Sequence, residues 1–292
     1  MSIHSQSRGE LVLVLVTILA AFGWIFAKES IVEMPPLLFM GIRFLLAGII
    51  LVMLGKRFFR GLNFANIKKA MMVGGVGSVA MGLWVSGLDH SNNLGVGAFI
   101  MSLGAILTPI MAKFLFGASP SNSVWYASLV AIIGLGFLSL ANGLDFELSH
   151  LFFLGSAFCV ALQMNLLSRF SLNIHVLVLT SIQLIVTGVV LLLVSFIFET
   201  MPESISNEAI KWLLLSIVIA TSLRFFLQTY GLSLTPVSHA AILLNLEPVW
   251  TAILATFWFS EVMKANQIIG CSLIFLAMLV SRWHQFKEFI KK

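Results

Sequence analysis

A carboxylate and a proline stand next to each other, as Glu247 and Pro248, in the otherwise apolar run ILLNLEPVW of residues 242–250. A charged side chain near the centre of a bilayer costs about 2.5–3.5 kcal/mol on insertion scales, so Glu247 is expected to face protein or water. Pro248 has no backbone N–H and its ring crowds the preceding turn, so a helix is expected to bend here and to free a carbonyl near Leu244. Such a carbonyl is tolerated only against protein or a polar cavity. The two residues therefore predict a polar site within the membrane-spanning part of the protein.

Two arginines in other apolar runs accompany this carboxylate. Glu247 is expected either to contact a substrate or accept a proton, or to form a structural pair between helices. Its expected partner is Arg224, whose guanidinium either reaches inward to Glu247 or extends to the membrane interface. Arg43 either clamps the carboxylate or phosphate of a substrate, or anchors to lipid headgroups or to Glu29 and Glu33.

Uncharged polar and aromatic side chains deep in the apolar runs are further candidates for a binding cavity. Interhelical hydrogen bonds average only about 0.6 kcal/mol, so some of these polar groups are expected to serve packing alone. Trp24 and Trp250 either form a stacking wall or a cation–π face for a substrate amine, or simply fill the core. Pro109 is a second expected helix kink. The polar candidates are Ser102, Gln163, Asn165, Gln183, Gln228 and Asn245.

Apolar residues dominate the chain that must position these groups. Of its 292 residues, 59% are hydrophobic and 10% are charged, and the mean hydropathy is +1.03. A soluble domain carries about one-quarter charged residues, so the composition predicts an all-α integral membrane protein. A bilayer core about 30 Å thick needs about 20 apolar residues per helix. Ten such spans are expected, at residues 10–28, 36–54, 67–88, 94–116, 122–142, 149–168, 175–198, 208–231, 236–259 and 265–283.

The basic residues indicate the orientation of these spans. If the N-terminus is cytoplasmic, twelve of the seventeen Lys and Arg residues fall on the cytoplasmic side. The positive-inside rule then predicts that both termini are cytoplasmic. The net charge of +5 follows from this topology and requires no nucleic-acid partner. The histidines show no metal spacing and no Ser/His/Asp set converges, so neither an enzyme, a metal site nor a cofactor is expected.

The chain also shows weak internal similarity. Sliding it on itself by 144 residues matches Gly87 to Gly231, and sliding it by 140 residues matches Arg43 to Gln183 and Gly48 to Gly188. The two halves, residues 1–146 and 147–292, would each hold five spans. Because five is odd, the second half enters the membrane from the opposite side, which predicts two inverted five-helix repeats.

These features together resemble the EamA family of the drug/metabolite transporter superfamily. The resemblance rests on MPPLLFMGIRFLLAG (34–48), TSIQLIVTG (180–188), and SHAAILLNLEPVW (238–250) followed by FWFSEV (257–262). The segment LFGASPS (115–121) departs from the family because it lacks the Gly-Glu pair usual at that loop.

The resemblance implies a secondary transporter of the bacterial inner membrane, with the lipid bilayer and a small molecule as its partners. Members usually export amino acids or related small metabolites by alternating access through a central cavity. Two alternatives remain open: a flippase of a lipid-linked or phosphorylated amphiphile, and a metabolite uptake carrier. Ten spans can enclose a path alone, so a monomer is expected, with a dimer as the alternative.

Overall fold

The chain folds into a helical bundle. The computed structural model describes residues 3–31, 33–60, 62–90, 100–101, 103–118, 122–139, 148–258 and 265–281. Within these ranges every regular element is a helix and no strand occurs, so the prediction of an all-α protein is confirmed for the described residues.

Six helical segments of the described chain are long and apolar enough to cross a membrane. One of them is interrupted by a π-helical stretch, η2, in which the hydrogen bonds skip one extra residue. The segments are α1 (Ile3–Ile31), α2 (Pro36–Gly55) with the short 3₁₀ helix η1 (Lys56–Phe59), α3 (Phe64–Asp89), α7 (Leu148–Phe170), α8 (Val176–Phe198), and α9 (Asn207–Leu215) with η2 (Ser216–Leu223) and α10 (Arg224–Leu234).

The remaining helices are shorter. The expected span at 236–259 is divided in two, and the expected span at 94–116 is described mainly from residue 103 onward. The number of ten spans therefore stays a prediction. These helices are α5 (Gly104–Phe116), α6 (Asn122–Ser139), α11 (Val237–Leu244), α12 (Glu247–Trp258) and α13 (Ala265–Ser281).

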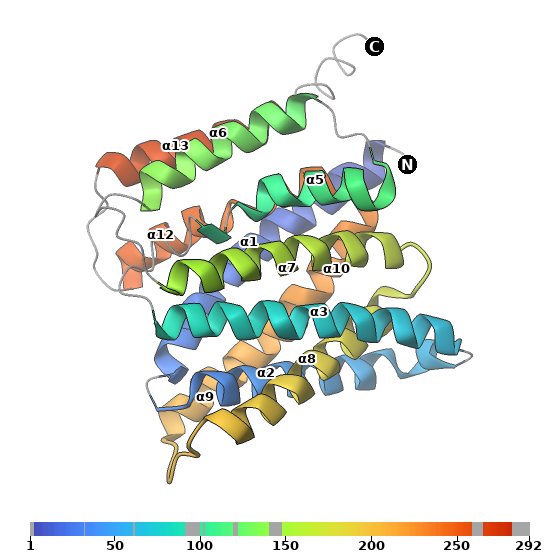
Figure 1. The fold of residues 1–292 in the computed structure, drawn as a ribbon, viewed down its shortest axis with the longest axis vertical. Coiled ribbons are helices and arrows are strands. Elements are labelled where there is room, and N and C mark those ends of the chain that lie inside the picture. Colours follow the sequence, from blue (N-terminus) through green and yellow to red (C-terminus); the bar gives the residue numbers. More distant parts are fainter. Residues whose placement is uncertain are drawn as a thin grey trace.

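The helices lie roughly alongside one another (Figure 1). Helices α6 and α13 pack together at one edge of the bundle, and α2 and α8 pack together at the opposite edge. Helix α1 contacts α9, η2, α10, α11 and α12, so the first helix of the chain is surrounded by elements from its second half. A polar group on α1 is therefore placed to meet polar groups from the second half.

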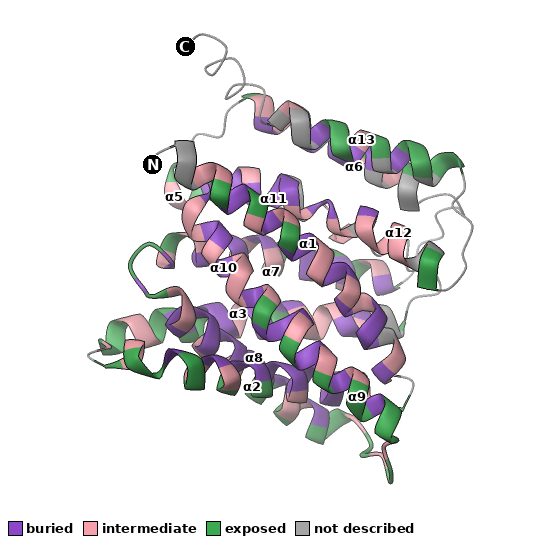
Figure 2. Ribbon diagram, turned by 180° about the vertical axis from the view of Figure 1, so that it is seen from behind, coloured by how far each residue is buried: buried purple, intermediate pink, exposed green. Residues whose placement is uncertain are grey.

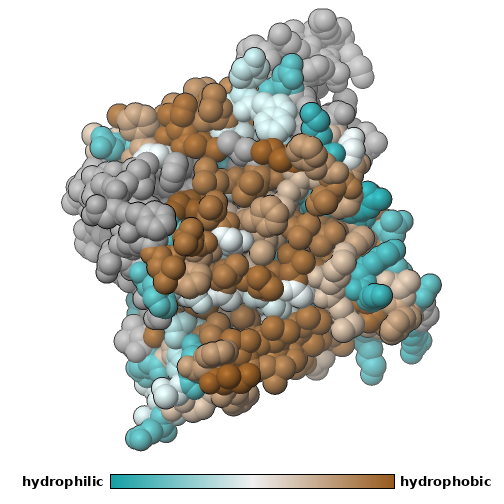
Figure 3. Space-filling view, viewed as in Figure 1, coloured by the Kyte–Doolittle hydropathy of each residue, from teal (hydrophilic) through white to brown (hydrophobic). Residues whose placement is uncertain are grey.

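Burial follows the arrangement expected of a protein in lipid. Buried positions concentrate on the faces where helices meet (Figure 2). The outer surface carries large apolar side chains such as Met53, Phe196 and Phe257, and Figure 3 shows apolar side chains covering much of one face. A surface of this kind is favourable against hydrocarbon and unfavourable against water.

Two glycines bring α2 and α8 into close contact. A Cβ atom on Gly48 would lie 2.8 Å from the backbone nitrogen of Ile185 in α8, and one on Gly188 would lie 2.7 Å from the Cα of Leu45 in α2. Small residues at such positions let two helix backbones approach closely. Gly48 and Gly188 are the pair that the 140-residue offset matches, so the equivalent positions of the two halves pack on each other's helices.

Two carboxylates, Glu199 and Glu33, connect the two halves of the chain near the N-terminus of α2. The Glu199 carboxylate accepts hydrogen bonds from the backbone N–H groups of Leu37 and Leu38, both 2.8 Å long, in the first turn of α2. It also accepts one from the hydroxyl of Ser195. Glu33 accepts from the backbone N–H and the hydroxyl of Ser206, the N-cap of α9. Acceptors at a helix N-terminus satisfy N–H groups that have no partner within the helix.

Glu199→Gln is expected to weaken this attachment. An amide has one acceptor oxygen, so its NH₂ group would face one of the two N–H donors of α2 that the carboxylate now binds. Loss of a helix cap costs about 0.5–2 kcal/mol, and a fall of about 1 kcal/mol in stability is expected. Thermal unfolding of the purified protein measures it. Glu203→Gln is the matched control, because Glu203 is exposed in the same loop, and an equal effect of both changes would contradict the capping role.

Candidate functional site

The expected ninth span is interrupted where the sequence places its carboxylate. Helix α11 ends at Leu244, a turn follows at Asn245 and Leu246, and α12 begins at Glu247. The backbone N–H groups of Asn245 and Leu246 turn back to the carbonyls of Ile242 and Leu243, which closes the turn with short-range hydrogen bonds. Glu247 thus occupies the first turn of α12, where the positive end of the helix dipole favours a negative charge.

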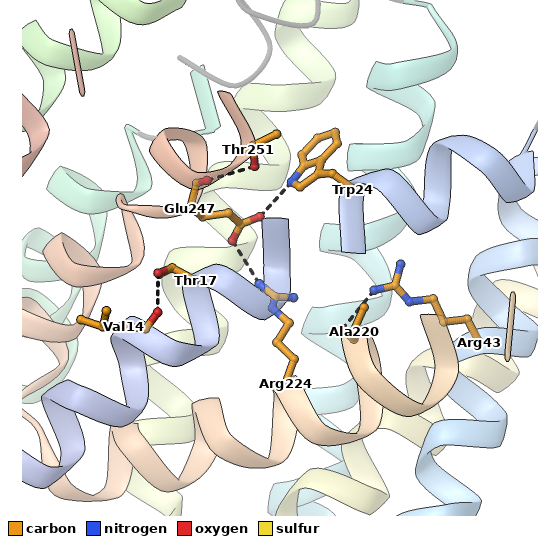
Figure 4. A network of polar contacts seen from close by, with 8 residues as sticks. All are labelled: Val14, Thr17, Trp24, Arg43, Ala220, Arg224, Glu247 and Thr251. Carbon is orange, nitrogen blue, oxygen red and sulfur yellow. Dashed lines mark hydrogen bonds and ion pairs between the residues drawn. The ribbon is translucent and has the colours of Figure 1, made fainter. Parts of the chain in front are cut away.

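The Glu247 carboxylate binds two partners from two other helices (Figure 4). Its Oε1 accepts a hydrogen bond of 2.9 Å from the indole Nε1–H of Trp24 in α1. Its Oε2 forms an ion pair with Nη2 of Arg224, the first residue of α10, at 3.3 Å. Of the two outcomes expected for Arg224, the structure has the inward one. The Arg224 and Glu247 side chains are 19% and 23% exposed, so the pair adjoins open space rather than being fully enclosed.

The Arg43 side chain binds η2 rather than Glu247. It is buried in α2 and donates hydrogen bonds from Nε to the hydroxyl of Thr221 and from Nη2 to the carbonyl oxygen of Ala220 at 3.2 Å. Both acceptors belong to η2. The Thr221 hydroxyl in turn donates to the carbonyl of Ser216, five residues earlier, as the π-helical winding allows. Among the described residues Arg43 contacts no carboxylate within ion-pair distance, and Glu33 is instead bound to Ser206.

Gly23 allows the two arginine sites to share one region beside α1. A Cβ atom on Gly23 would lie 2.9 Å from the Cβ of Ala220 and 3.6 Å from Nη2 of Arg43. The next residue along α1 is Trp24, which binds Glu247. The guanidinium of Arg43 and the Trp24–Glu247–Arg224 network therefore lie against adjacent residues of one helix (Figure 4).

Three of the predicted polar residues form hydrogen bonds outside this network. The amide of Gln163 in α7 donates to Oε1 of Gln183 in α8 at 3.4 Å, which is a long hydrogen bond. Asn165 donates from Nδ2 to the carbonyl of Thr108 in α5 at 3.0 Å and to that of Ala161 at 2.9 Å. The bonds to Gln183 and Thr108 connect α7 to α8 and α5, whereas the bond to Ala161 lies within α7.

The other predicted residues have different surroundings. Buried polar atoms with no partner among the described residues occur on Gln228 (Oε1), Asn245 (Nδ2) and Trp250 (Nε1). The Trp250 ring packs beside Val249 and Ile274. Helix α5 runs through Pro109 without an assigned interruption, in contrast to the break before Pro248. Ser102 lies outside the described residues.

Thr221 and Gly23 are the site residues that sequence reasoning missed. A threonine in an apolar span is common, and no pattern in the sequence marks residues 216–223 as π-helical. The small residue Gly23 directly before Trp24 is the one signal that could have suggested a close helix approach here.

The arrangement can recognise a polar molecule within the membrane. It combines a carboxylate, two guanidiniums and an indole N–H at the point where a helix is broken, and these groups come from α1, α2, α10 and α12. Broken helices in transporters occur where the backbone lines a cavity. No group of three or more His, Cys, Asp or Glu residues that could hold a metal occurs in the described part of the chain.

Comparison with known sequences identifies the family. The sequence model of the EamA-like transporter family matches the chain twice, over residues 7–140 and 148–283. The chain belongs to this family. The resemblance noted in the sequence is thereby confirmed, and each half of the chain carries one copy of the EamA-like unit.

Two relatives agree with this assignment. An uncharacterised transporter of Archaeoglobus fulgidus is 25% identical over 254 residues, which cover 87% of this chain and 79% of the relative. The uncharacterised transporter YoaV of Bacillus subtilis is 23% identical over 269 residues, covering 89% and 91%. Together with the long apolar helices, membership of the EamA-like family indicates that this chain is a multi-pass membrane transporter.

The fold also matches a solved structure. A crystal structure of another protein superimposes with a TM-score of 0.81 at 18% sequence identity, covering 94% of this chain and 96% of the other. At this identity the match concerns the fold alone.

Proposed function

We propose that this EamA-like protein is a secondary transporter that exports amino acids or related small metabolites by alternating access through a central cavity. The observation that carries the proposal is the Trp24–Glu247–Arg224 network, which places a partly exposed ion pair at a helix break in an apolar bundle. Ionisable residues within membrane spans are costly and mark substrate or ion pathways.

The proposed architecture is ten helices in two inverted five-helix repeats, residues 1–146 and 147–292. The two matches to the EamA-like unit and the reciprocal packing of Gly48 and Gly188 support two related halves. The distribution of Lys and Arg supports cytoplasmic termini, and the proposed location is the bacterial inner membrane. A single chain of this design can enclose the path, so the proposed transporter acts as a monomer.

Counterflow in proteoliposomes tests the function. Vesicles containing the purified protein are preloaded with a mixture of amino acids and small metabolites, and mass spectrometry follows their exchange against labelled compounds outside. One or a few compounds are expected to exchange faster than in protein-free vesicles.

Glu247→Gln is the variant for this experiment. It is expected to exchange the same compounds at least about tenfold more slowly, because the charged partner of Arg224 is lost. Circular dichroism and size-exclusion chromatography establish that both proteins are folded. Absence of any exchange by folded wild-type protein would refute transport of soluble metabolites.

A further inference from the structure

The charges within the spans do not balance. Glu247 is the one carboxylate near the middle of an expected span. Glu10, although buried in α1, and Glu208 lie at the first residues of their spans, and the other acidic residues lie at span ends, in loops or in the tails. Arg224 is paired with Glu247, and the guanidinium of Arg43 lies close by, hydrogen-bonded to Ala220 of η2 and next to Gly23, the residue before Trp24. Arginine stays protonated in proteins, so the region carries one net positive charge when Glu247 is ionised.

Hydrogen-bond donors are also in excess. A guanidinium has five N–H groups. In the described structure Arg43 uses two of them, toward Thr221 and Ala220, and Arg224 uses one, toward Glu247. The buried Nε of Arg224 has no acceptor among the described residues.

The segment that carries Glu247 adds two more such donors. Nδ2 of Asn245, whose residue is 8% exposed, and Nε1 of Trp250 are both buried without a described acceptor. The one unpartnered acceptor on the face of α10 that carries Arg224 is Oε1 of Gln228, one turn away. The net positive charge and the excess of unpaired N–H donors therefore both favour a negatively charged ligand.

From this imbalance we infer that the transported molecule carries one net negative charge, on a carboxylate or phosphodiester group that binds Arg43 and Arg224. Both groups offer several acceptor oxygens, and guanidinium groups bind them through paired hydrogen bonds. An anion of this kind neutralises the region as the site closes, whereas a neutral or zwitterionic molecule leaves one charge uncompensated in the membrane.

The inference rests on the proposed transport function and narrows it, because it favours anionic metabolites over zwitterionic amino acids as the substrate. An amino acid with an apolar side chain is a zwitterion at neutral pH. Its 2-oxo acid has nearly the same shape and a net charge of −1, and its amide has a net charge of +1. Comparing the three forms therefore varies the net charge of the molecule while its size stays nearly constant.

The experiment compares these forms in counterflow with wild-type protein. Alanine, leucine and phenylalanine, their 2-oxo acids and their amides are each tested, with protein-free vesicles as the blank. In every series that exchanges, the 2-oxo acid is expected to exchange about tenfold faster than the zwitterion, because it supplies the missing charge. Faster exchange of the zwitterion or the amide would overturn the inference and leave transport established. If no form of any series exchanges in folded protein, this inference falls together with transport of small metabolites.

Arg43→Gln tests the source of the preference. The variant removes the surplus charge while its amide can still donate to Thr221, so the ratio of 2-oxo acid to zwitterion exchange is expected to fall about tenfold. Arg43→Lys keeps the charge and should keep the preference. Arg57→Gln removes a guanidinium from η1, outside the network, and should leave the ratio unchanged. An unchanged ratio in Arg43→Gln would show that Arg43 does not select the anion.

Discussion

Glu247→Gln is expected to lose stability, and combining it with Arg224→Gln is expected to restore that stability without restoring transport. Removing one partner of a buried ion pair costs about 3–5 kcal/mol because the other charge is left unpaired. The Glu247 and Arg224 side chains are 19% and 23% exposed, so water screens part of this cost and a loss of about 2–3 kcal/mol is expected. Replacing both charges removes the unpaired guanidinium.

Thermal unfolding in detergent and counterflow separate the two roles of the pair. The single variant should unfold at a lower temperature than wild type, and the double variant close to wild type. Both should be slow in counterflow, because neither keeps the carboxylate at the helix break. Glu203→Gln, in an exposed loop, controls for the loss of a carboxylate elsewhere. A double variant that transports normally would show that the pair serves structure alone.

The position of this network could be predicted from the sequence because it depends on strong local rules. A proline after a glutamate in an apolar run indicates both a helix break and a costly charge. The structure has the break at Asn245 and Leu246 and places Arg224 on Glu247. The indole donor from Trp24 was harder to predict, because a tryptophan in a membrane protein usually packs or lies at the interface.

The setting of Arg43 could not be predicted in the same way. Its acceptors depend on the π-helical stretch η2, in which Thr221 and Ser222 bond carbonyls five residues earlier. Such winding depends on how α1, α2 and η2 pack, and a single sequence does not reveal this packing. The polar residues Gln163 and Gln183 show the same limit, since the sequence marks each as a cavity candidate and does not reveal that their side chains contact each other.

Gly188→Ala is expected to be among the most destabilising single substitutions on α8. The new Cβ atom would lie 2.7 Å from the Cα and 2.8 Å from the Cβ of Leu45, and closer still to its backbone nitrogen. A flexible side chain could move aside, but these are atoms of the α2 helix itself. Overpacking a closely fitted interface costs about 1–3 kcal/mol, and a loss of about 3 kcal/mol is expected here because backbone must shift. Thermal unfolding measures this loss.

Gly75→Ala is the matched control for this substitution. Gly75 lies in α3 with no neighbouring atom within 4 Å of an added Cβ, so its replacement should leave stability unchanged or raise it by up to about 1 kcal/mol through helix propensity. If Gly188→Ala behaved like Gly75→Ala, α2 and α8 could not be packed as closely as described.

The substitution at Gly188 should also reach the functional site. Arg43 lies on α2 two residues before Leu45, the residue that the new methyl group would displace. A shift of α2 away from α8 would change the fit of Arg43 to Thr221 and Ala220, whose hydrogen bonds tolerate little change in length. Gly188→Ala is therefore expected to slow counterflow at temperatures where the variant is still folded. Normal transport by a destabilised but folded variant would indicate that the interface between α2 and α8 does not position Arg43.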